Sequence, residues 1–401
     1  MKALRKYLDK IKPNFEEGGK LGMFHSLFEG IETFLFVSNE TSKSGVHIHD
    51  SIDAKRTMTA VIIALIPAML FGMYNTGYQH YLSIGVDAGC WETFIFGFLA
   101  VLPIIAVSYI VGLGIEFTVA QWKKEEIQEG FLVSGILIPL IVPVDTPLWM
   151  IAVATAFAVV FAKEVFGGTG YNIFNVALVT RAFLFFAYPA AMSGDQVFVR
   201  TSTTFGLGGG TVVDGFSGAT PLAQINMAPN EMVGTFQTVD ALNHPLSLWD
   251  MFLGLIPGSI GETSTLAILL GAAILLYTGV ASWKTMLSVF VGGAVAAVLF
   301  NLAGTTVAMS VSPLEHICLG GFAFGAVFMA TDPVTSARTE TGKYIYGLLV
   351  GMVAIAIRAL NPGYPEGMML AILLMNIFAP LIDYYVVQNN ISRRLKRAGA
   401  K

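Results

Sequence analysis

The chain has 401 residues, of which 55% are hydrophobic and only 12% are charged. Soluble domains carry about 25% charged residues, so this composition excludes an ordinary soluble protein and predicts an integral membrane protein. The net charge of −4 does not indicate a nucleic-acid partner, and two cysteines are too few for an iron–sulfur cluster held by this chain alone.

Residues 1–55 are predicted to form a separate arm. Apolar side chains recur there at helical spacing between charged residues, at Leu4, Tyr7, Leu8, Ile11 and Phe15. This spacing predicts an amphipathic helix that lies on the inner membrane surface. A second apolar run, at 27–36, is too short to span the membrane. Two interpretations stay open: the arm docks a partner subunit, or it covers a site in the membrane.

Ten apolar runs follow the arm and are candidate membrane spans. They lie at 57–75, 93–120, 131–144, 148–162, 173–192, 264–283, 285–302, 316–330, 344–360 and 367–389. We therefore expect an all-α polytopic membrane protein with about ten transmembrane helices. Its parts are the arm (1–55), a first five-helix unit (56–192), an extracytoplasmic loop (193–263), a second five-helix unit (264–389) and a basic cytoplasmic tail (390–401).

The Lys and Arg residues predict which side of the membrane each loop occupies. Of the 23, all but Arg181, Arg200 and Arg358 lie before the first run, after the last run or in alternate loops. Positive residues favour cytoplasmic loops, so both termini are predicted to be cytoplasmic. The loop 193–263, which holds only Arg200, is then predicted to lie outside the cytoplasm.

Three runs are short for a membrane, and their positions indicate a repeat. The third, fourth and eighth runs cover roughly 21 to 23 Å as helices, against a hydrocarbon core of about 30 Å. The third and eighth both begin with Gly-Phe and end near Asp and Pro, and glycine-rich breaks follow the fourth and ninth runs. This pattern predicts two inverted five-helix repeats with broken helices. The alternative is a chance match, because Gly and Pro are common in membrane helices.

A short motif in the 193–263 loop is a candidate functional site. "DGFSGAT" places Asp214, Ser217, Gly218 and Ala219 just before Thr220, after the glycine-rich segment 206–210. These residues predict a turn followed by small side chains. A Thr hydroxyl flanked by small residues is accessible to another enzyme, as a covalent attachment point requires; the alternative is an ordinary loop hydroxyl.

The motif resembles the acceptor sequence of exported flavin transferases, which esterify the Thr hydroxyl with the phosphate of FMN. Long segments elsewhere resemble the family of B subunits of Na+-translocating NADH:quinone oxidoreductases. They are "KEVFGGTGYNIFNVALVTRAFLFFAYPA", "SGDQVF", "GGFAFGAVFMATDPV" and "NPGYPEGMMLAILLMNIFAPLID". The resemblance covers the chain from the arm to the tail. It implies a ten-helix inverted repeat like that of urea channels, in the bacterial inner membrane.

The resemblance also implies cofactors and site residues. Thr220 would carry FMN through a phosphoester, and the four motif residues before it would serve recognition by the transferase. A non-covalent riboflavin would lie near Asn172 and Asn175, whose carboxamides both donate and accept hydrogen bonds. Where the family often has Pro, Val176 follows here, which leaves the local helix geometry open. The alternative is that the two asparagines cap a helix.

Quinone and sodium sites are expected towards the cytoplasm. Gly112 matches a family position associated with the quinone site, although Leu113 replaces a common Gly. Two acids near the inner ends of their runs, Glu116 and Asp383, are our candidates for the sodium path, because acids inside a membrane are costly and sodium prefers oxygen ligands. The alternative for both is a position at the membrane interface. Two further acids, Glu164 and Asp332, rank second and could cap helices.

Arg181 lies halfway along the fifth run, where an unpaired cation would be costly. It is expected to pair with an acid or to lie near the electron-rich edge of a flavin.

The function expected from these observations is that of a membrane redox subunit. It would pass electrons from a neighbouring flavoprotein subunit through FMN and riboflavin to quinone, coupled to outward Na+ transport. No G-x-G-x-x-G follows a strand, so an NADH site is not expected in this chain. Partners would be the sister subunits and the flavin transferase. Two alternatives stay open: the equivalent subunit of an ion-translocating ferredoxin:NAD oxidoreductase, and a small-solute channel or transporter without flavin.

Overall fold

The computed structural model describes residues 2–15, separate positions between 19 and 45, and residues 54–123, 130–194 and 197–399. Several features named above lie outside the described residues. These are much of the arm, including parts of the run 27–36, and two residues of the "SGDQVF" segment. Four of the 23 Lys and Arg residues counted above also lie outside, namely Lys20, Lys43, Lys124 and Lys401.

Six helices are long and apolar enough to cross a membrane. They are α3 (Ala54–Ser83), α4 (Cys90–Lys123), α6 with its continuation (Leu148–Phe166), α11 (Trp283–Ala303), α15 (Glu340–Leu360) and α16 (Met368–Gly399). Three shorter apolar helices lie among them: α5 (Phe131–Leu140), α7 (Val176–Ala187) and α10 (Thr265–Thr278). The described part of the chain holds no strand beyond two isolated bridges. The prediction of an all-α membrane protein is confirmed.

The third and eighth runs are broken, as their length predicts. α5 ends at Leu140, and the buried chain that follows leads to α6 without helical structure. In the eighth run, α13 (Pro313–Cys318) ends before a turn at Gly320, whose φ of +59° favours glycine. A three-residue helix, α14 (Phe322–Phe324), and a π turn over Gly325–Met329 complete this run.

Two runs differ in length from the prediction. The fourth is longer, because α6 (Leu148–Ala158) continues through a π turn over Val159–Lys163 and a 3₁₀ turn over Glu164–Phe166. The charged Lys163 ended the apolar run in the sequence, but its charge is paired in the structure. The fifth is shorter: α7 has 12 residues, because Asn175 caps its start and Pro189 follows its end.

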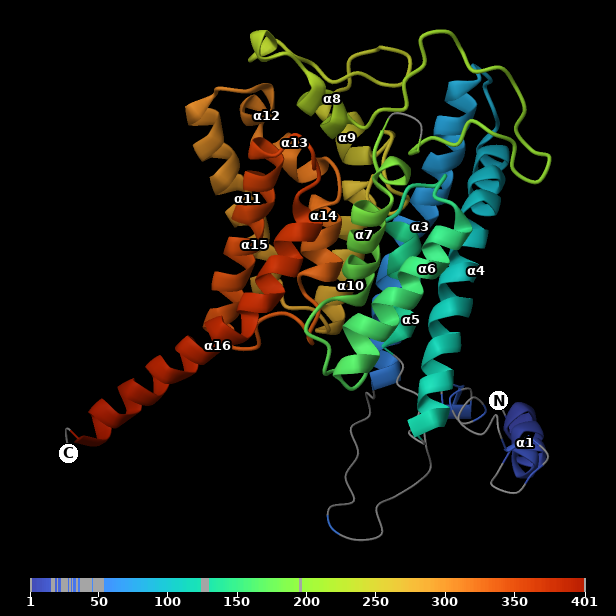
Figure 1. Cartoon of the computed structure of the whole chain (residues 1–401), viewed down its shortest axis with the longest axis vertical. Coiled ribbons are helices and arrows are strands. Elements are labelled where there is room, and N and C mark those ends of the chain that lie inside the picture. The colour runs from blue at the N-terminus through green and yellow to red at the C-terminus, as the bar shows by residue number, and fades with distance from the viewer. Residues whose placement is uncertain are drawn as a thin grey trace.

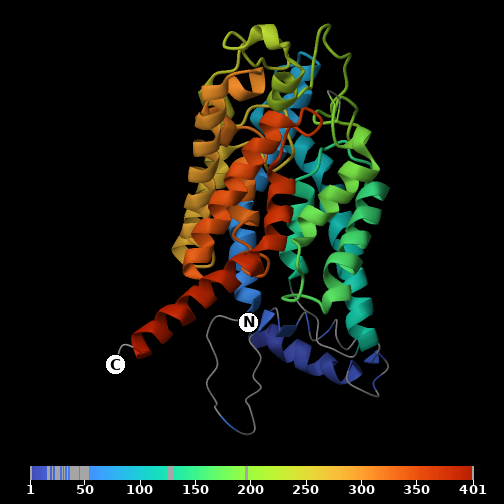
Figure 2. The same ribbon diagram turned by 60° about the vertical axis from the view of Figure 1, so that its left-hand side comes forward.

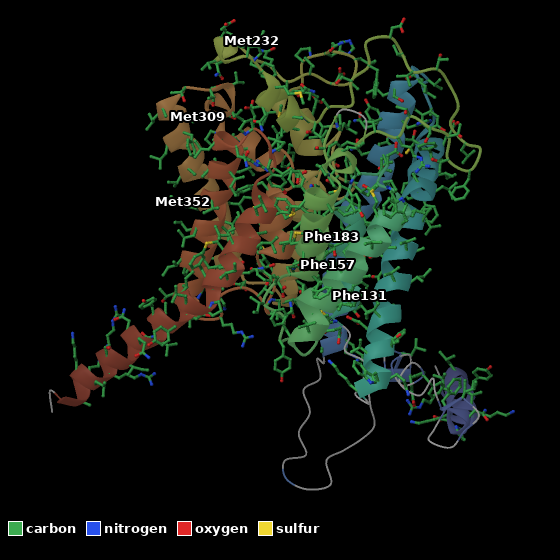
Figure 3. The ribbon with its side chains drawn as sticks, viewed as in Figure 1. Phe131, Phe157, Phe183, Met232, Met309 and Met352 are labelled. Atoms are coloured by element: carbon green, nitrogen blue, oxygen red, sulfur yellow. The ribbon has the colours of Figure 1, made fainter. Side chains whose placement is uncertain are left out.

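The helices form one bundle, and its main hydrophobic core contains buried side chains of both halves. Close helix approach at glycine allows this packing, since a Cβ on Gly351 of α15 would lie 2.1 Å from the Val289 carbonyl oxygen of α11. Aromatic pairs also join neighbouring helices: the ring centroids of Phe157 on α6 and Phe183 on α7 lie 4.7 Å apart in a stacked arrangement (Figure 3).

One glycine–phenylalanine contact recurs in the two halves. A Cβ on Gly112 of α4 would lie 1.8 Å from Cζ of Phe131, the first residue of α5. A Cβ on Gly293 of α11 would lie 2.4 Å from Cζ of Phe322, the first residue of α14. In each half, the helix of the second run thus contacts the Phe ring of the Gly-Phe pair in the third run.

The two ends of the bundle differ in character. The helix α1 (Lys2–Ile11) and the C-terminal end of α16 lie at one end, the lower end in Figures 1 and 2. Three short helices lie at the opposite end. They are α8 (Pro221–Met227), α9 (Leu248–Leu253) and α12 (Val307–Ser310). A second apolar core lies under α8, built from its Leu222 and Ile225 and from residues of α9, α12 and α13.

Candidate functional site

A cavity lies between the two halves, towards the end that holds the termini. Its volume is about 100 Å³, below the about 300–1,000 Å³ of small-molecule and cofactor sites, so a larger ligand requires its walls to move apart. Its polar walls come from Ser134, Lys163, Thr169, Asn172, Asn175, Thr331 and Asp332, and its apolar walls include Val61, Leu137, Val176, Leu275 and Phe328. The cavity therefore combines an apolar body with a few convergent polar groups.

Asn172 and Asn175, predicted from the glycine break, both line this cavity. Asn175 also caps α7, because its Oδ1 accepts from the backbone N–H groups of Ala177 at 3.0 Å and Leu178 at 3.3 Å. Its Nδ2 donates to Asp332 Oδ2 across the cavity wall at 3.4 Å. The Nδ2 of Asn172 donates to the Phe174 carbonyl at 2.9 Å, which leaves its second amide hydrogen for a ligand.

The second half contributes Asp332 to the same cavity. Its carboxylate accepts from the Val334 N–H and from Thr335 Oγ1, both at 3.0 Å. These bonds hold the turn at the end of the eighth run, so Asp332 is the cap that the sequence allowed, and at the same time a cavity wall.

A buried ion pair stands behind the cavity. Lys163 Nζ donates to Glu116 Oε1, and the two side chains are 3% and 4% exposed. Glu116 Oε2 has no hydrogen-bond partner among the described residues. Lys163 is therefore the link between the cavity and Glu116. Sequence reasoning missed this role and treated Lys163 as a loop charge; its place directly before the glycine break was the available signal. Glu164 next to it pairs with Lys123 at 3.6 Å.

Two π turns meet at the cavity. One brings Lys163 to the wall from the end of α6, and the other brings Phe328 there from the eighth run. Single π turns inside helices are frequent at functional sites, because they re-aim side chains at a cost in hydrogen bonding.

Arg181 pairs with acids, which confirms one of its two expected roles. Its guanidinium donates to Glu262 Oε1 at 2.5 Å and to Ser259 Oγ at 3.3 Å, and it forms an ion pair with Glu366. All three charged side chains are largely buried. Sequence reasoning missed both glutamates, which stand immediately before the sixth and tenth runs.

Asp383, the second candidate for the sodium path, holds the start of α15. Its carboxylate accepts from the N–H groups of Arg338 at 2.7 Å and Thr339 at 3.0 Å, and from Thr339 Oγ1 at 2.5 Å. Its oxygens are therefore already engaged, unlike Glu116 Oε2. The structure does not bring Glu116 and Asp383 into contact through any hydrogen bond or ion pair among the described residues.

Thr220 is the N-cap of α8 at the opposite end of the bundle. Its Oγ1 accepts from the Ala223 N–H at 3.3 Å, and its side chain is half-buried. Gln224 of α8 fixes the segment, because its side chain donates to the carbonyls of Ala219 and Val239 and accepts from the Val239 N–H. The motif is thus held on the bundle by α8.

The four residues before Thr220 differ in exposure. Asp214 is exposed and Ser217 half-buried, whereas Gly218 and Ala219 are buried. Ser217 Oγ accepts from the Ala219 N–H at 3.4 Å, which closes the turn that the small residues predict. Asp214 and Ser217 are therefore the members of the motif that another protein can reach.

A second cavity adjoins α8. Its volume is about 890 Å³, and its wall includes Ile225 of α8 together with Thr235, Thr238, Ser247 and Ser312. α8 has seven residues, or about 10 Å, so the cavity begins within one helix length of Thr220. On its far side, hydrogen bonds from Ser247 hold the pKa of Asp250 below its usual value and cap α9.

Gly112, the candidate quinone residue, is packed against an aromatic ring. The space that a small residue leaves on α4 is filled by Phe131, labelled in Figure 3. A flat ligand at Gly112 would require this ring to move, so the role of Gly112 in quinone binding stays a prediction.

Gly112→Ala and Gly114→Ala are expected to have opposite effects on stability. The methyl group that Gly112→Ala adds would clash with Phe131, and overpacking costs about 1–3 kcal/mol. At the exposed Gly114 no atom lies within 4 Å, and Ala there gains roughly 0.5–1 kcal/mol of helix propensity. Thermal unfolding of the full chain in detergent measures both, and equal midpoints would mean that the Phe131 ring yields freely.

Comparison with known proteins places similarity along nearly the whole chain. A family model described as the NQR2, RnfD, RnfE family matches residues 41–392. A protein of Chromohalobacter salexigens, named as the B subunit of a Na(+)-translocating NADH-quinone reductase, is 44% identical over 421 residues, which cover 99% of this chain and 97% of that protein. The identically named protein of Azotobacter vinelandii is 45% identical over 420 residues, covering 98% and 99%. That of Pseudoalteromonas atlantica is 44% identical over 423 residues, covering 99% and 100%.

Proposed function

The chain belongs to the NQR2, RnfD, RnfE family, and from this premise we propose that it is the flavin-carrying B subunit, in the membrane part of a Na+-translocating NADH:quinone reductase. As a member of this family it is a multi-pass membrane protein and a subunit of an oxidoreductase complex. In the proposed function it accepts electrons from a neighbouring flavoprotein subunit and passes them through FMN and riboflavin to quinone, while Na+ moves outward.

Thr220 carries the proposal. Its hydroxyl stands in the motif "SGAT", at the end of the bundle opposite both termini, on a segment that α8 holds in place. Asp214 and Ser217 beside it are accessible to a modifying enzyme. Esterification would tether FMN next to the cavity that adjoins α8, which has room for a ring system. The bound flavin supplies the electron chemistry, and the chain sets its position.

We propose that riboflavin binds at the cavity between the two halves, whose walls must move apart to admit it. Apolar side chains such as Leu137 and Phe328 offer walls for a planar ring, and Ser134, Asn172 and Thr331 offer hydroxyl and amide groups for ring edges and ribityl hydroxyls. Lys163 lies at the wall with its charge neutralised by Glu116, so the site is polar without a net charge from this pair. These residues would bind and orient the flavin and limit water access.

We further propose ten crossings in two inverted repeats, with both termini in the cytoplasm of a bacterium. The recurrent contact of Gly112 with Phe131 and of Gly293 with Phe322 supports the repeat, because it joins corresponding runs of the two halves. The common location of α1 and the end of α16 supports an even number of crossings.

For sodium, Glu116 is the stronger candidate in this structure. Glu116 Oε2 is a buried carboxylate oxygen without a hydrogen-bond partner among the described residues, which is energetically costly and leaves the oxygen free to bind a cation. The carboxylate oxygens of Asp383 already accept hydrogen bonds at the start of α15. Glu116→Gln is expected to raise the Na+ concentration that half-maximal quinone reduction requires, and Asp383→Asn to change it less. An unchanged Na+ dependence at full flavin content would remove Glu116 from the path.

This experiment needs one control, because Glu116→Gln also leaves Lys163 buried and unpaired. The double variant Glu116→Gln with Lys163→Met removes both charges and is expected to recover most of the lost stability. If the double variant also recovered the wild-type Na+ dependence, the effect of the single variant would be structural.

Flavin content tests the proposed function directly. The full chain, purified from a host with its flavin transferase, is expected to carry one FMN mass on the denatured polypeptide and to release one riboflavin. A small-solute channel would show neither. The ferredoxin-dependent relative would also carry FMN, but the close relatives compared above are named as quinone reductase subunits, and quinone reduction by the assembled complex separates the two.

A further inference from the structure

The last half of α16 stands clear of the bundle. The helix runs from Met368 to Gly399 without interruption, and its residues 384–399, here the α16 extension, are exposed apart from the half-buried Val386. Figures 1 and 2, seen from directions 60° apart, both show this part running outward from the lower rim of the bundle and away from α1. Asp383, at its base, is fixed by three hydrogen bonds to the start of α15.

An apolar stripe runs along the α16 extension, and Tyr385, which is 65% exposed, lies outside it near its start. Tyr384, Val387, Ile391 and Leu395 are 43–67% exposed and follow one another at intervals of three and four residues. At about 100° per residue, these four side chains fall within an arc of roughly 80° on the helix surface. An exposed stripe of four large apolar side chains indicates a site that contacts another protein or a membrane.

The opposite face is basic. Arg393, Lys396 and Arg397 fall within an arc of roughly 100° whose centre lies nearly opposite the apolar stripe. Arg394 lies at the border of the stripe, where a long side chain can bury its stem and keep its charge in water. None of the four has an ion-pair partner in the part of the chain that the structure describes.

A helix with an apolar stripe and an uncompensated basic face is typical of helices that bind the surface of an anionic bilayer. It continues a candidate membrane span without a break, at the same end of the bundle as α1, and it points outward from the bundle. We propose that the α16 extension lies in the headgroup region of the bilayer leaflet on the terminus side and binds anionic phospholipid, with the stripe of Tyr384, Val387, Ile391 and Leu395 towards the acyl chains.

An environment-sensitive fluorophore on the full chain tests this orientation. After Cys90→Ser removes the exposed cysteine, the buried Cys318 remains protected, and a single new cysteine is placed by Leu395→Cys on the stripe or by Asn389→Cys on the opposite face. The labelled chain is studied in nanodiscs of phosphatidylcholine with and without phosphatidylglycerol. We expect the probe at 395 to shift to shorter wavelength and to resist an aqueous quencher when phosphatidylglycerol is present, and the probe at 389 to stay accessible to the quencher.

Charge reversal is the second arm of the test. Arg393→Glu, Arg394→Glu, Lys396→Glu and Arg397→Glu together are expected to abolish the effect of phosphatidylglycerol on the probe at 395, and high salt is expected to weaken it in the parent chain. The four positions are outside the bundle, so the thermal midpoint and the flavin content should stay those of the parent.

Three outcomes would overturn the proposal. Equal quenching at 395 and 389 in both lipids would mean that the α16 extension stays in water. Protection at 395 that appears only after the sister subunits are added, without dependence on phosphatidylglycerol, would assign the stripe to a protein partner. Protection that depends on chain concentration would assign it to a second copy. None of these outcomes alters the flavin measurement, so the failure of this inference and of the proposed function are distinguishable.

Discussion

Thr220→Val is expected to remove the FMN mass from the polypeptide completely. Val keeps the β-branched shape of Thr but lacks Oγ1, the atom that would form the phosphoester. The loss of the N-cap bond to Ala223 costs about 1 kcal/mol, too little to unfold a segment that Leu222 and Ile225 anchor in an apolar core. Intact-mass spectrometry and in-gel fluorescence after denaturation measure the covalent flavin.

The matched control is Thr235→Val, an exposed threonine in the same segment whose hydroxyl donates to the Met232 carbonyl. It should keep the FMN mass. Riboflavin should remain in both variants, because the cavity with Asn172 is at the other end of the bundle from Thr220. An FMN mass that persists in Thr220→Val would assign the attachment to another residue, and an unmodified parent chain would favour a channel.

Arg181→Met is expected to cause the largest loss of stability of any single substitution considered. It leaves Glu262 and Glu366 without their cation in a site where both carboxylates are 18% exposed or less. Breaking a buried ion pair by removing one partner costs about 3–5 kcal/mol, because a buried charge stays uncompensated. Arg181→Lys should recover only part of this, since one ammonium cannot replace a planar guanidinium that binds three groups.

The thermal midpoint of the full chain in detergent measures this effect, with Arg200→Met as the control. Arg200 faces Asp145 at 3.8 Å with a quarter of its side chain exposed, so its loss should cost less than about 1 kcal/mol. Replacing the whole cluster, by Arg181→Met with Glu262→Gln and Glu366→Gln, should restore most of the midpoint. Equal midpoints for Arg181→Met and Arg200→Met would contradict a large contribution of the buried Arg181 cluster to stability.

Some helix ends can be predicted from the sequence, and others cannot. The third run was expected to be too short for the membrane, and its helix α5 ends at Leu140, between Pro139 and Pro143, which are both visible in the sequence. The fourth run was expected to be short and is not, because Lys163 reads as the end of an apolar segment unless its partner is known. That partner, Glu116, is 47 residues away in the chain.

Some residues of the candidate site can likewise be predicted from the sequence, and others cannot. The glycine break pointed to Asn172 and Asn175, and both line the cavity. The wall opposite them, with Phe328 and Asp332, comes from the second half, more than 150 residues later, and Asn175 meets Asp332 directly. Gly112 was expected to belong to a quinone site, yet the ring of Phe131 from the next helix fills the space beside it.

Composition and local order thus determined what depends on each segment alone. Hydropathy predicted an all-α membrane protein and the distribution of Lys and Arg predicted its sidedness, because each is a property of neighbouring residues, and the resemblance of the motif before Thr220 predicted an attachment site. The tertiary structure decided which buried charges are compensated, which acids are engaged and which glycines face a ring. Those outcomes depend on contacts between residues far apart in sequence, whose partners no local pattern specifies; Arg181 lies 81 residues from Glu262, and packing alone brings them together.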